Sequence, residues 1–206
     1  MFGNGDKKAE EVTVFHKTTA SFEYLINGDS DLLLVAEPDP VVYEEMENAG
    51  FKYEKDPIAI EGLVFMVNAT NPVDSLTIDQ IKGIYTGEIT NWSEVGGLDL
   101  PIAPFQRNDT SGSQVMMIDT VMGDTPMMEV PTELVSVDMG DLIDAVRGYD
   151  NQANAIGYTV YYYAANMEMA DGLKIIKVEG VEPSESTLAS GEYPLLSHYY
   201  AVMKST

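Results

Sequence analysis

The sequence predicts an α/β fold, because strand-like and helix-like segments alternate along most of the chain. At 206 residues, of which 45% are hydrophobic, the chain is long enough to form a substantial core. A chain of this size buries roughly 70% of its extended surface on folding. Neither an internal repeat nor a long linker interrupts the alternation, so one large domain or two small lobes both fit this length.

Three elements are expected near the N-terminus. Residues 20–27 have the pattern of a helix that Gly28 closes. Residues 31–36 form a short apolar run typical of a buried strand, and residues 41–49 predict a second helix that ends at Gly50. Glycine favours such ends because it readily adopts the left-handed backbone conformation that terminates a helix.

The middle of the chain continues the same alternation. An almost continuous apolar run at residues 62–67 predicts a strand that is covered on both faces. After it, Thr77 is placed to cap a short helix whose apolar residues share one face. The remaining expected elements are a strand at 101–105, a helix at 114–122, a helix at 142–146, and a strand at 158–163 that continues into a helix.

The charge balance excludes several classes of partner. Asp and Glu number 34 against 11 Lys and Arg, which gives a formal net charge of −23. Such a surface repels nucleic acid and anionic membranes. The tyrosines at 161–163 have no basic neighbours, so we expect them to serve core and lobe packing rather than to stack on bases. No nucleic-acid partner is expected.

Few residue types in this chain bind metals or act as nucleophiles. Cysteine is absent, which excludes disulfides, thiolate metal sites and a cysteine nucleophile. His16 and His198 are not in a metal-ligand spacing, so neither a metal nor another cofactor is expected. No run approaches the ~20 apolar residues that cross a bilayer, and the start of the chain lacks a run of signal-peptide length.

One segment has the pattern of an oxyanion-binding loop. Residues 107–114 read Arg-Asn-Asp-Thr-Ser-Gly-Ser-Gln and lie between a predicted strand and an apolar helix. The first N–H groups of a helix lack intrahelical partners, and the helix dipole places about half a positive charge there. A phosphate at such an end meets several donors that already point at it. The alternative is an ordinary capped helix after a polar turn.

Each side chain of this loop has a task in the oxyanion interpretation. Ser111 and Ser113 supply hydroxyl donors, and Gly112 lets the backbone approach the anion because it has no Cβ. Arg107 offers a planar fork that matches two phosphate oxygens. An ionised Asp109 only accepts hydrogen bonds, so it fits a ligand that still carries a proton, such as HPO₄²⁻, and rejects sulfate.

Segment 76–92 resembles the phosphate-binding, PstS-like substrate-binding proteins of ABC transporters. It runs through Leu-Thr, a short helix, Tyr-Thr-Gly and Ile-Thr-Asn-Trp, as that family does. Three more segments match in the family's order, namely Arg-x-Asp-x-Ser-Gly-Ser at 107–113, Ile-Gly-Tyr at 156–158 and Tyr-Pro-Leu at 193–195. The resemblance covers about residues 12–206 and is most specific across residues 62–113.

The resemblance implies a two-lobed fold like that of type II periplasmic binding proteins, with three-layer αβα lobes and the ligand in the cleft. Lobe one would comprise residues 1–66 and 171–206, and lobe two residues 67–170. The implied ligand-binding residues are Arg107, Asp109, Ser111, Gly112 and Ser113 in lobe two, with Thr18 and Glu37 in lobe one. The family's usual first strand and Asp-Gly-Ser-Thr loop have no match before Val12, so lobe one is expected to be incomplete, with an exposed sheet edge.

These observations predict an extracytoplasmic protein that binds inorganic phosphate and delivers it to an ABC transporter permease, exported and anchored by a segment absent from this chain. The alternative is a degenerate binding-protein-like domain used for protein interaction or sensing without ligand, which the unmatched first unit favours. The exposed lobe-one edge would then invite self-association. An enzyme is not expected, because the sequence places no histidine, lysine or metal cluster near Asp109 and Ser111 to complete a catalytic site.

Overall fold

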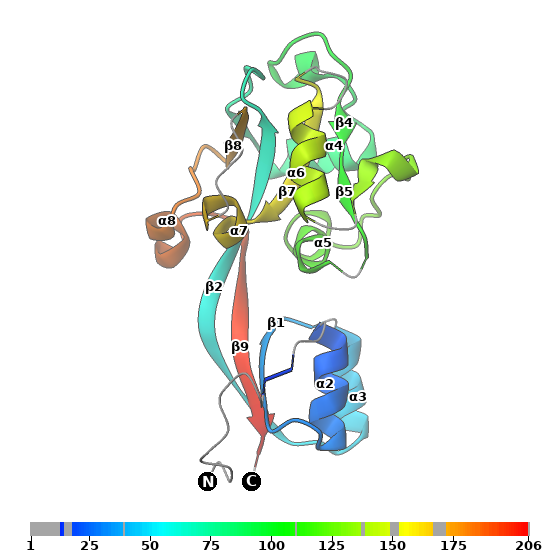
Figure 1. The fold of residues 1–206 in the computed structure, drawn as a ribbon, viewed down its shortest axis with the longest axis vertical. Coiled ribbons are helices and arrows are strands. Elements are labelled where there is room, and N and C mark those ends of the chain that lie inside the picture. The colour runs from blue at the N-terminus through cyan, green and yellow to red at the C-terminus, as the bar shows by residue number, and fades with distance from the viewer. Residues whose placement is uncertain are drawn as a thin grey trace. The chain divides into compact units, whose positions relative to one another are not determined.

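The computed structural model describes the chain in two compact units (Figure 1). Unit 1 comprises the described residues up to Pro57 and from Tyr200 onward, and unit 2 comprises Ile58–Tyr199. Both boundaries fall inside strands, β2 (Tyr53–Asn68) and β9 (Leu196–Lys204), so each of these strands contributes to both units. The residues described are 13–14, 18–38, 40–109, 111–136, 139–148, 153–166 and 172–205.

The compact units have their boundaries at 57/58 and 199/200. The lobe boundaries at 66/67 and 170/171 that the resemblance implies stay a prediction. Strand β2 continues past residue 66 to Asn68, and β8 (Leu173–Val178) pairs with β2 inside unit 2.

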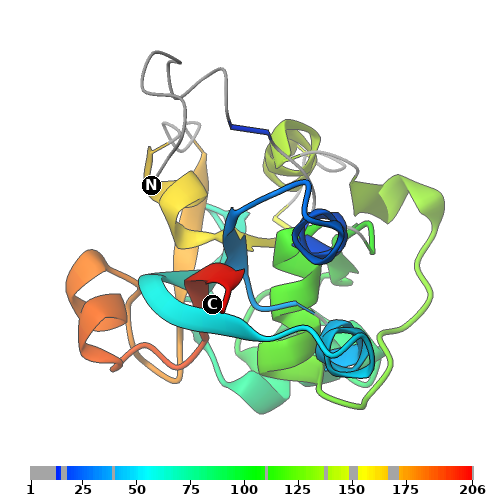
Figure 2. The ribbon, with the colours of Figure 1, turned by 90° about the horizontal axis from the view of Figure 1, so that it is seen from below.

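Unit 1 contains the helix, strand and helix expected near the N-terminus. Helices α2 (Thr18–Asn27) and α3 (Pro40–Asn48) flank strand β1 (Leu32–Ala36) along the chain, and Figure 2 views both helices nearly end-on. Strand β1 pairs with β9, which in turn pairs with β2. The buried apolar residues of this unit are Phe22, Leu25, Leu33, Val35, Val42, Met46 and Val202. They come from both helices and from two strands, so unit 1 has a core of its own.

The sheet of unit 2 is built around β2. One edge of β2 pairs antiparallel with β7 (Ala155–Val160), and its C-terminal end pairs antiparallel with β8 on the other side. Strand β3 (Ser75–Leu76) runs parallel to β8, and β4 (Ala103–Pro104) runs parallel to β7. The order is therefore β3-β8-β2-β7-β4. The apolar run predicted as a doubly covered strand is fully buried, as residues 62–67 of β2 show.

Helices cover both faces of this sheet, which gives unit 2 three layers. On one face, α4 (Ile78–Thr86) and α5 (Gly112–Met117) contribute to the largest core cluster, and a π-helical turn at Ile118–Met122 continues α5. On the other face, α6 (Met139–Gly148) packs over a second cluster. The shorter helices are η1 (Trp92–Val95), η3 (Thr132–Leu134), α7 (Tyr161–Asn166) and α8 (Glu185–Ser190).

Two local features shape unit 2, of which the cap at Thr77 was predicted from the sequence. Thr77 caps α4, and its side chain accepts a hydrogen bond from the backbone N–H of Gln80 while the Gln80 side chain accepts one from the backbone N–H of Thr77. Gly157 of β7 faces α6, where a Cβ would lie 2.7 Å from Val146 Cγ2 and 3.1 Å from Leu142 Cδ1. Glycine in the Ile-Gly-Tyr segment therefore allows α6 to pack closely on the sheet.

Candidate functional site

Arg107 ends a short strand and is held by the neighbouring one. Strand β5 (Gln106–Arg107) pairs in parallel with β6 (Val135–Ser136), which places Arg107 opposite Ser136. The Arg107 side chain is buried, and its Nε donates a hydrogen bond to the Ser136 carbonyl oxygen at 3.2 Å. A buried guanidinium with a fixed Nε is oriented before any ligand arrives.

The backbone of Arg107 is held from two further directions. Its N–H donates to Gln114 Oε1 at 3.2 Å and to the Tyr158 hydroxyl at 3.1 Å. The Tyr158 hydroxyl also donates to Gln114 Oε1. Gln114 belongs to α5 and Tyr158 to the middle of β7, so three segments that are distant in sequence meet at one amide.

The start of α5 gathers small polar groups. Ser111 is the N-cap residue with an extended backbone, and its hydroxyl makes no hydrogen bond to the N–H groups of its own helix. Instead, Ser111 Oγ and Ser113 Oγ lie 3.0 Å apart. Gly112 stands between them, and a Cβ at Gly112 would meet no atom within 4 Å. Space is therefore free at Gly112, between the half-buried Ser111 and the buried Ser113.

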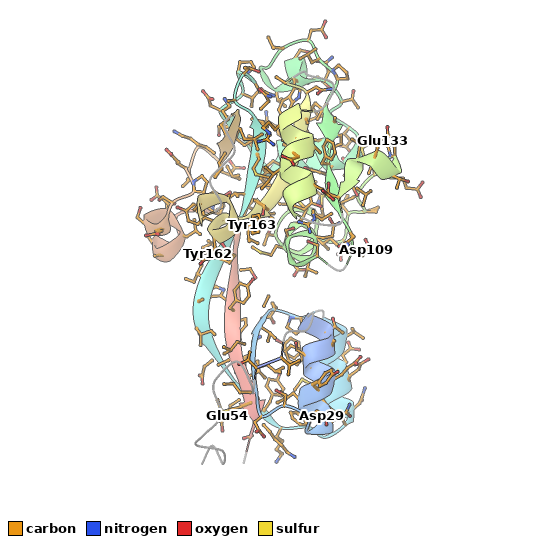
Figure 3. All side chains as sticks on the ribbon, viewed as in Figure 1. Asp29, Glu54, Asp109, Glu133, Tyr162 and Tyr163 are labelled. Atoms are coloured by element: carbon orange, nitrogen blue, oxygen red, sulfur yellow. The ribbon has the colours of Figure 1, made fainter. Side chains whose placement is uncertain are left out.

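Asp109 lies on the same loop and is exposed to solvent (Figure 3). Burial raises the pKa of the Tyr158 hydroxyl, and the negative charge of Asp109 raises it further, whereas the Arg107 N–H and the Arg107 charge oppose the rise. The Tyr158 phenol thus senses the charges of both residues. The loop contributes one carboxylate among several donors, which is the combination that recognises an anion carrying a proton.

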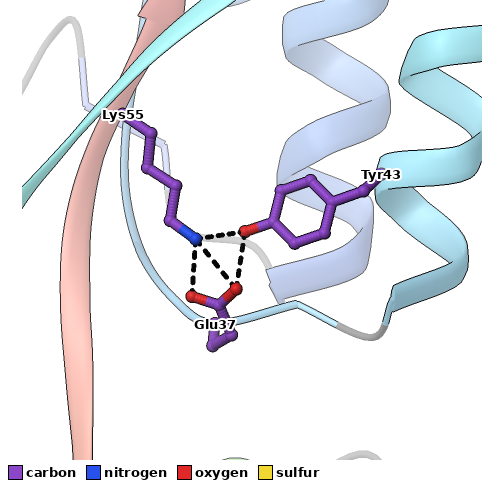
Figure 4. Close-up of polar contacts among 3 residues, drawn as sticks. All are labelled: Glu37, Tyr43 and Lys55. Carbon is purple, nitrogen blue, oxygen red and sulfur yellow. Dashed lines mark hydrogen bonds and ion pairs between the residues drawn. The ribbon is translucent and has the colours of Figure 1, made fainter.

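The two remaining predicted ligand-binding residues belong to unit 1. Thr18 is the first residue of α2, and Glu37 follows β1 directly. The Glu37 carboxylate accepts hydrogen bonds from Lys55 Nζ at 2.7 and 2.8 Å and from the Tyr43 hydroxyl at 2.8 Å (Figure 4). The structure therefore brings Arg107, Asp109, Ser111, Gly112 and Ser113 onto one loop of unit 2, and places Thr18 and Glu37 in unit 1.

Lys55 sits among aromatic rings as well as beside the carboxylate. Its Nζ lies 3.9 Å from the centroid of the Tyr200 ring and 4.8 Å from that of Tyr43. Partial burial would raise the pKa of Glu37, but hydrogen bonds from Lys55 and Tyr43 and the charge of Lys55 outweigh it, so this pKa lies below its ordinary value. Glu37 is consequently ionised and paired at neutral pH.

Metal binding has no support in the described part of the chain. The described residues contain no group of three or more His, Cys, Asp or Glu side chains that could hold a metal ion. The donors around Ser111 and Ser113 are hydroxyl and N–H groups, which recognise anions rather than cations.

Comparison with known proteins establishes the family. The sequence matches the PBP superfamily domain over residues 5–206. The chain belongs to the PBP superfamily.

Among curated proteins, this PBP-superfamily chain is 30% identical over 165 residues to the phosphate-binding protein PstS of Bacillus subtilis, an alignment that covers 80% of this chain and 52% of the relative. It is 28% identical over 194 residues to PstS of Staphylococcus haemolyticus, covering 91% of this chain and 59% of the relative. The chain thus spans about half to three fifths of the length of these relatives.

Solved structures agree with this assignment. A phosphate ABC transporter substrate-binding protein of Clostridium perfringens, crystallised with bound phosphate, superposes with a TM-score of 0.70 at 30% identity and covers 91% of this chain and 71% of its own. An ABC-type phosphate transport receptor from Vibrio cholerae gives a TM-score of 0.73 at 25% identity, covering 91% and 72%. The resemblance to PstS-like proteins and the expected two-lobed α/β fold are confirmed.

Sequence reasoning missed several groups that shape the site of this PBP-superfamily domain. Gln114 was the last letter of the predicted loop but had no assigned role, and Tyr158 was noted only within the Ile-Gly-Tyr segment. Ser136 and Lys55 carried no signal at all. A polar side chain at the start of a predicted apolar helix, such as Gln114, is the one signal that could have indicated a tertiary hydrogen bond.

Proposed function

We propose that this chain binds inorganic phosphate as the substrate-binding component of an ABC transporter. The observation that carries the proposal is the loop of unit 2, where the buried Arg107 precedes two serine hydroxyls that lie 3.0 Å apart beside the open space at Gly112. A relative of 30% identity that superposes on 91% of this chain was crystallised with bound phosphate. The chemistry of the loop and the ligand bound by this relative therefore both favour phosphate.

The loop supplies the interactions that a tetrahedral oxyanion needs. The Arg107 guanidinium would engage phosphate oxygens with planar, charge-assisted hydrogen bonds. The hydroxyls of Ser111 and Ser113, together with the first N–H groups of α5, would donate to the remaining oxygens. Asp109 would accept the proton of HPO₄²⁻ or H₂PO₄⁻. Sulfate carries no proton at neutral pH, so it would face Asp109 as an unpaired like charge.

The acidic surface does not oppose this function decisively. The chain has a formal net charge of −23, but repulsion in solution is screened over roughly 8 Å at physiological ionic strength. Binding relies instead on short hydrogen bonds to groups that are fixed in place. The net charge should slow the capture of phosphate more than it weakens the bound state.

Isothermal titration calorimetry of the wild-type chain tests the proposal directly. We expect heat of binding with phosphate and none with sulfate at the same ionic strength. The absence of binding to either anion at millimolar concentration would remove the delivery role for this chain. Turnover of a phosphomonoester would contradict a role in binding alone.

The relatives' names place such proteins in phosphate transport, and we propose the same setting here. The chain would act outside the cytoplasm and hand phosphate to an ABC transporter permease. The described residues include no helix long and apolar enough to span a membrane. Co-purification of the tagged chain with a permease, dependent on phosphate, would test the partnership.

A second candidate function is protein interaction without ligand, and strand β1 favours it. Among the described residues β1 ends the strand order, and Leu32 and Leu34 on it are 40% and 66% exposed. An apolar edge strand is a template for pairing with another chain. We propose that two copies associate through β1, which light scattering would detect as a dimer.

The matched variants for this candidate are Leu34→Lys and Leu98→Lys. Leu98 is 50% exposed and lies in unit 2, away from β1 in the chain. A lysine on an edge strand blocks pairing, so only Leu34→Lys should return the dimer to a monomer. A monomeric wild type would end this candidate, and an Arg107→Ala variant that binds phosphate like wild type would favour it over transport.

A further inference from the structure

The α5 helix carries the sequence of a capping box but does not form one. Ser111 at the N-cap and Gln114 three residues later repeat the relationship of Thr77 and Gln80 at the start of α4. In α4 the two side chains and backbone N–H groups bond reciprocally, which is the usual outcome of this pattern. In α5 the Ser111 side chain makes no such bond.

Gln114 is used elsewhere. Its Oε1 accepts from the Arg107 N–H at 3.2 Å and from the Tyr158 hydroxyl, and its Nε2 donates to Met127 Sδ at 3.3 Å. A backbone N–H can only donate, so the amide oxygen of Gln114 must face Arg107. The side chain that would cap the helix instead ties α5 to the end of β5.

The third member of this arrangement is anchored in the core. The Tyr158 ring lies 5.4 Å from the Tyr85 ring, edge to face, and 6.1 Å from the Phe65 ring. Tyr85 donates its own hydroxyl to the Phe105 carbonyl at 3.3 Å, two residues before Arg107. Two buried tyrosine hydroxyls therefore hold the strand that delivers Arg107, one through a carbonyl and one through an amide.

We propose that Tyr158 and Gln114 are positioning residues for the anion-binding loop. Both side chains accept a hydrogen bond from the Arg107 N–H, and Gln114 belongs to α5 together with Gly112 and Ser113. They therefore fix the distance between Arg107 and the start of α5, where the other ligand donors lie. The Ser111 hydroxyl is not used by its own helix either, because the Gln114 N–H donates to the Ser111 carbonyl oxygen at 3.0 Å. This inference rests on the proposed phosphate-binding function of the same loop.

The geometry explains why a distant hydroxyl should affect binding. The Arg107 N–H, Gln114 Oε1 and the Tyr158 hydroxyl are all buried, since their residues are 8%, 5% and 0% exposed. Removing one partner from a buried network loosens the others, because water does not replace it. A looser loop must be ordered when the anion binds, and that ordering lowers the affinity.

The test compares Tyr158→Phe with Tyr193→Phe. Tyr193 is equally buried in the same core, and its hydroxyl donates to the Leu63 carbonyl at 2.7 Å, away from the loop. Tyr158→Phe loses two buried hydrogen bonds and Tyr193→Phe loses one, so both variants should lower the melting temperature, Tyr158→Phe by more. Only Tyr158→Phe should weaken phosphate binding, by about tenfold.

Hydrogen exchange without ligand provides a readout independent of phosphate. We expect peptides spanning residues 106–116 to exchange faster in Tyr158→Phe and to match wild type in Tyr193→Phe. Gln114→Leu serves as the second variant if Tyr158→Phe folds poorly, with the same expectation. Wild-type exchange of this segment in both loop variants, or wild-type affinity in either, would overturn the inference.

The two readouts separate this inference from the proposed function. If the wild-type chain does not bind phosphate, the proposed function fails, and the exchange measurement still decides whether Tyr158 and Gln114 order the loop. If the wild-type chain binds phosphate and Tyr158→Phe binds equally well, the function stands and the positioning role fails.

Discussion

Lys55 Nζ lies 2.7 Å from Oε2 and 2.8 Å from Oε1 of Glu37, so the lysine holds both oxygens of a carboxylate that the sequence had suggested as a ligand group. Tyr43 donates to the same carboxylate. The contact joins the end of β1 to β2 within unit 1. Glu37 therefore has a structural partner whatever its part in ligand binding. Because Lys55 lowers the pKa of Glu37, the contribution of this pair to stability should depend on pH.

Lys55→Gln should destabilise unit 1 in a pH-dependent way. In the folded chain the pKa of Glu37 lies below its ordinary value of 4.5. Its pairing therefore stabilises the fold above that pH, and the contribution is lost as the pH falls through the folded pKa. The loss in melting temperature should be largest near about pH 7 and shrink toward about pH 3.

The control for this prediction is Lys177→Gln. Lys177 and Glu182 form an exposed pair with a separation of 3.9 Å, and such pairs contribute little. The Glu37 side chain is itself 37% exposed, so solvent screens its pair as well and the effect should be modest. An equal loss at both ends of the pH range in Lys55→Gln would show that the ammonium acts by packing rather than by charge.

Two substitutions of Arg107 should weaken phosphate binding to different extents. Arg107→Lys keeps the charge but loses the planar fork and the Nε bond to Ser136, so we expect about a tenfold loss in affinity. Arg107→Ala also leaves the bound anion without its cation, and we expect a loss of at least about 100-fold. Calorimetry measures both.

Arg147→Ala is the matched control, because Arg147 is the other arginine of the chain. Its side chain is 39% exposed and pairs with Asp144 on α6. We expect this variant to bind phosphate as wild type does. Equal losses in the Arg107 and Arg147 variants would mean that positive charge in general, rather than the loop, attracts the anion.

Asp109→Asn should change which anion binds. The amide of asparagine can donate as well as accept, so the loop would no longer require a protonated ligand. We expect weaker binding of phosphate and new binding of sulfate, with the preference for phosphate falling by at least about tenfold. Competition titrations with both anions give the ratio.

A surface carboxylate away from the loop controls for net charge in this experiment. Glu133 is exposed on η3 (Figure 3), and Glu133→Gln removes one negative charge as Asp109→Asn does. The Glu133 variant should keep the wild-type ratio. If both variants lose it, the discrimination comes from the overall field and not from a contact with Asp109.

The sequence predicted those features that depend on local pattern. The cap at Thr77, the apolar strand at residues 62–67 and the loop before α5 are all visible in a few neighbouring letters, and the structure contains each of them. The helix predicted at 114–122 begins two residues earlier, at Gly112, because Ser111 takes the N-cap. Local chemistry determines these elements, so single-sequence reasoning finds them.

Features that depend on distant pairing escaped prediction. Strands β5 and β6 have two residues each, too few for a periodic pattern, and they exist because they pair with one another. Strand β2 extends from Tyr53 to Asn68, whereas the apolar run covers only residues 62–67, and the first half of the strand is mostly exposed. The strand predicted at 158–163 ends at Val160, and the tyrosine run starts α7 instead. The hydrogen bonds of Gln114 and Tyr158 join three separate segments, which no local pattern encodes.

Gly157→Ala should destabilise unit 2. The added Cβ would lie 2.7 Å from Val146 Cγ2 and 3.1 Å from Leu142 Cδ1, both in the buried face of α6. Forcing a methyl group into a packed core costs about 1–3 kcal/mol, which for this chain length corresponds to a fall of roughly several degrees in melting temperature. An unchanged melting temperature would show that α6 shifts at no cost.

Gly112→Ala should have the opposite profile, with intact stability and impaired binding. An added Cβ at Gly112 would meet no atom within 4 Å, and alanine is better than glycine in a helix, so the melting temperature should stay level or rise slightly. The same methyl group would occupy the space through which an anion reaches the first N–H groups of α5. We expect phosphate affinity to fall by at least about tenfold, while Gly157→Ala keeps its affinity in the folded fraction. Wild-type affinity in Gly112→Ala would mean that phosphate does not approach the backbone at this turn, and the loop would lose its assigned role.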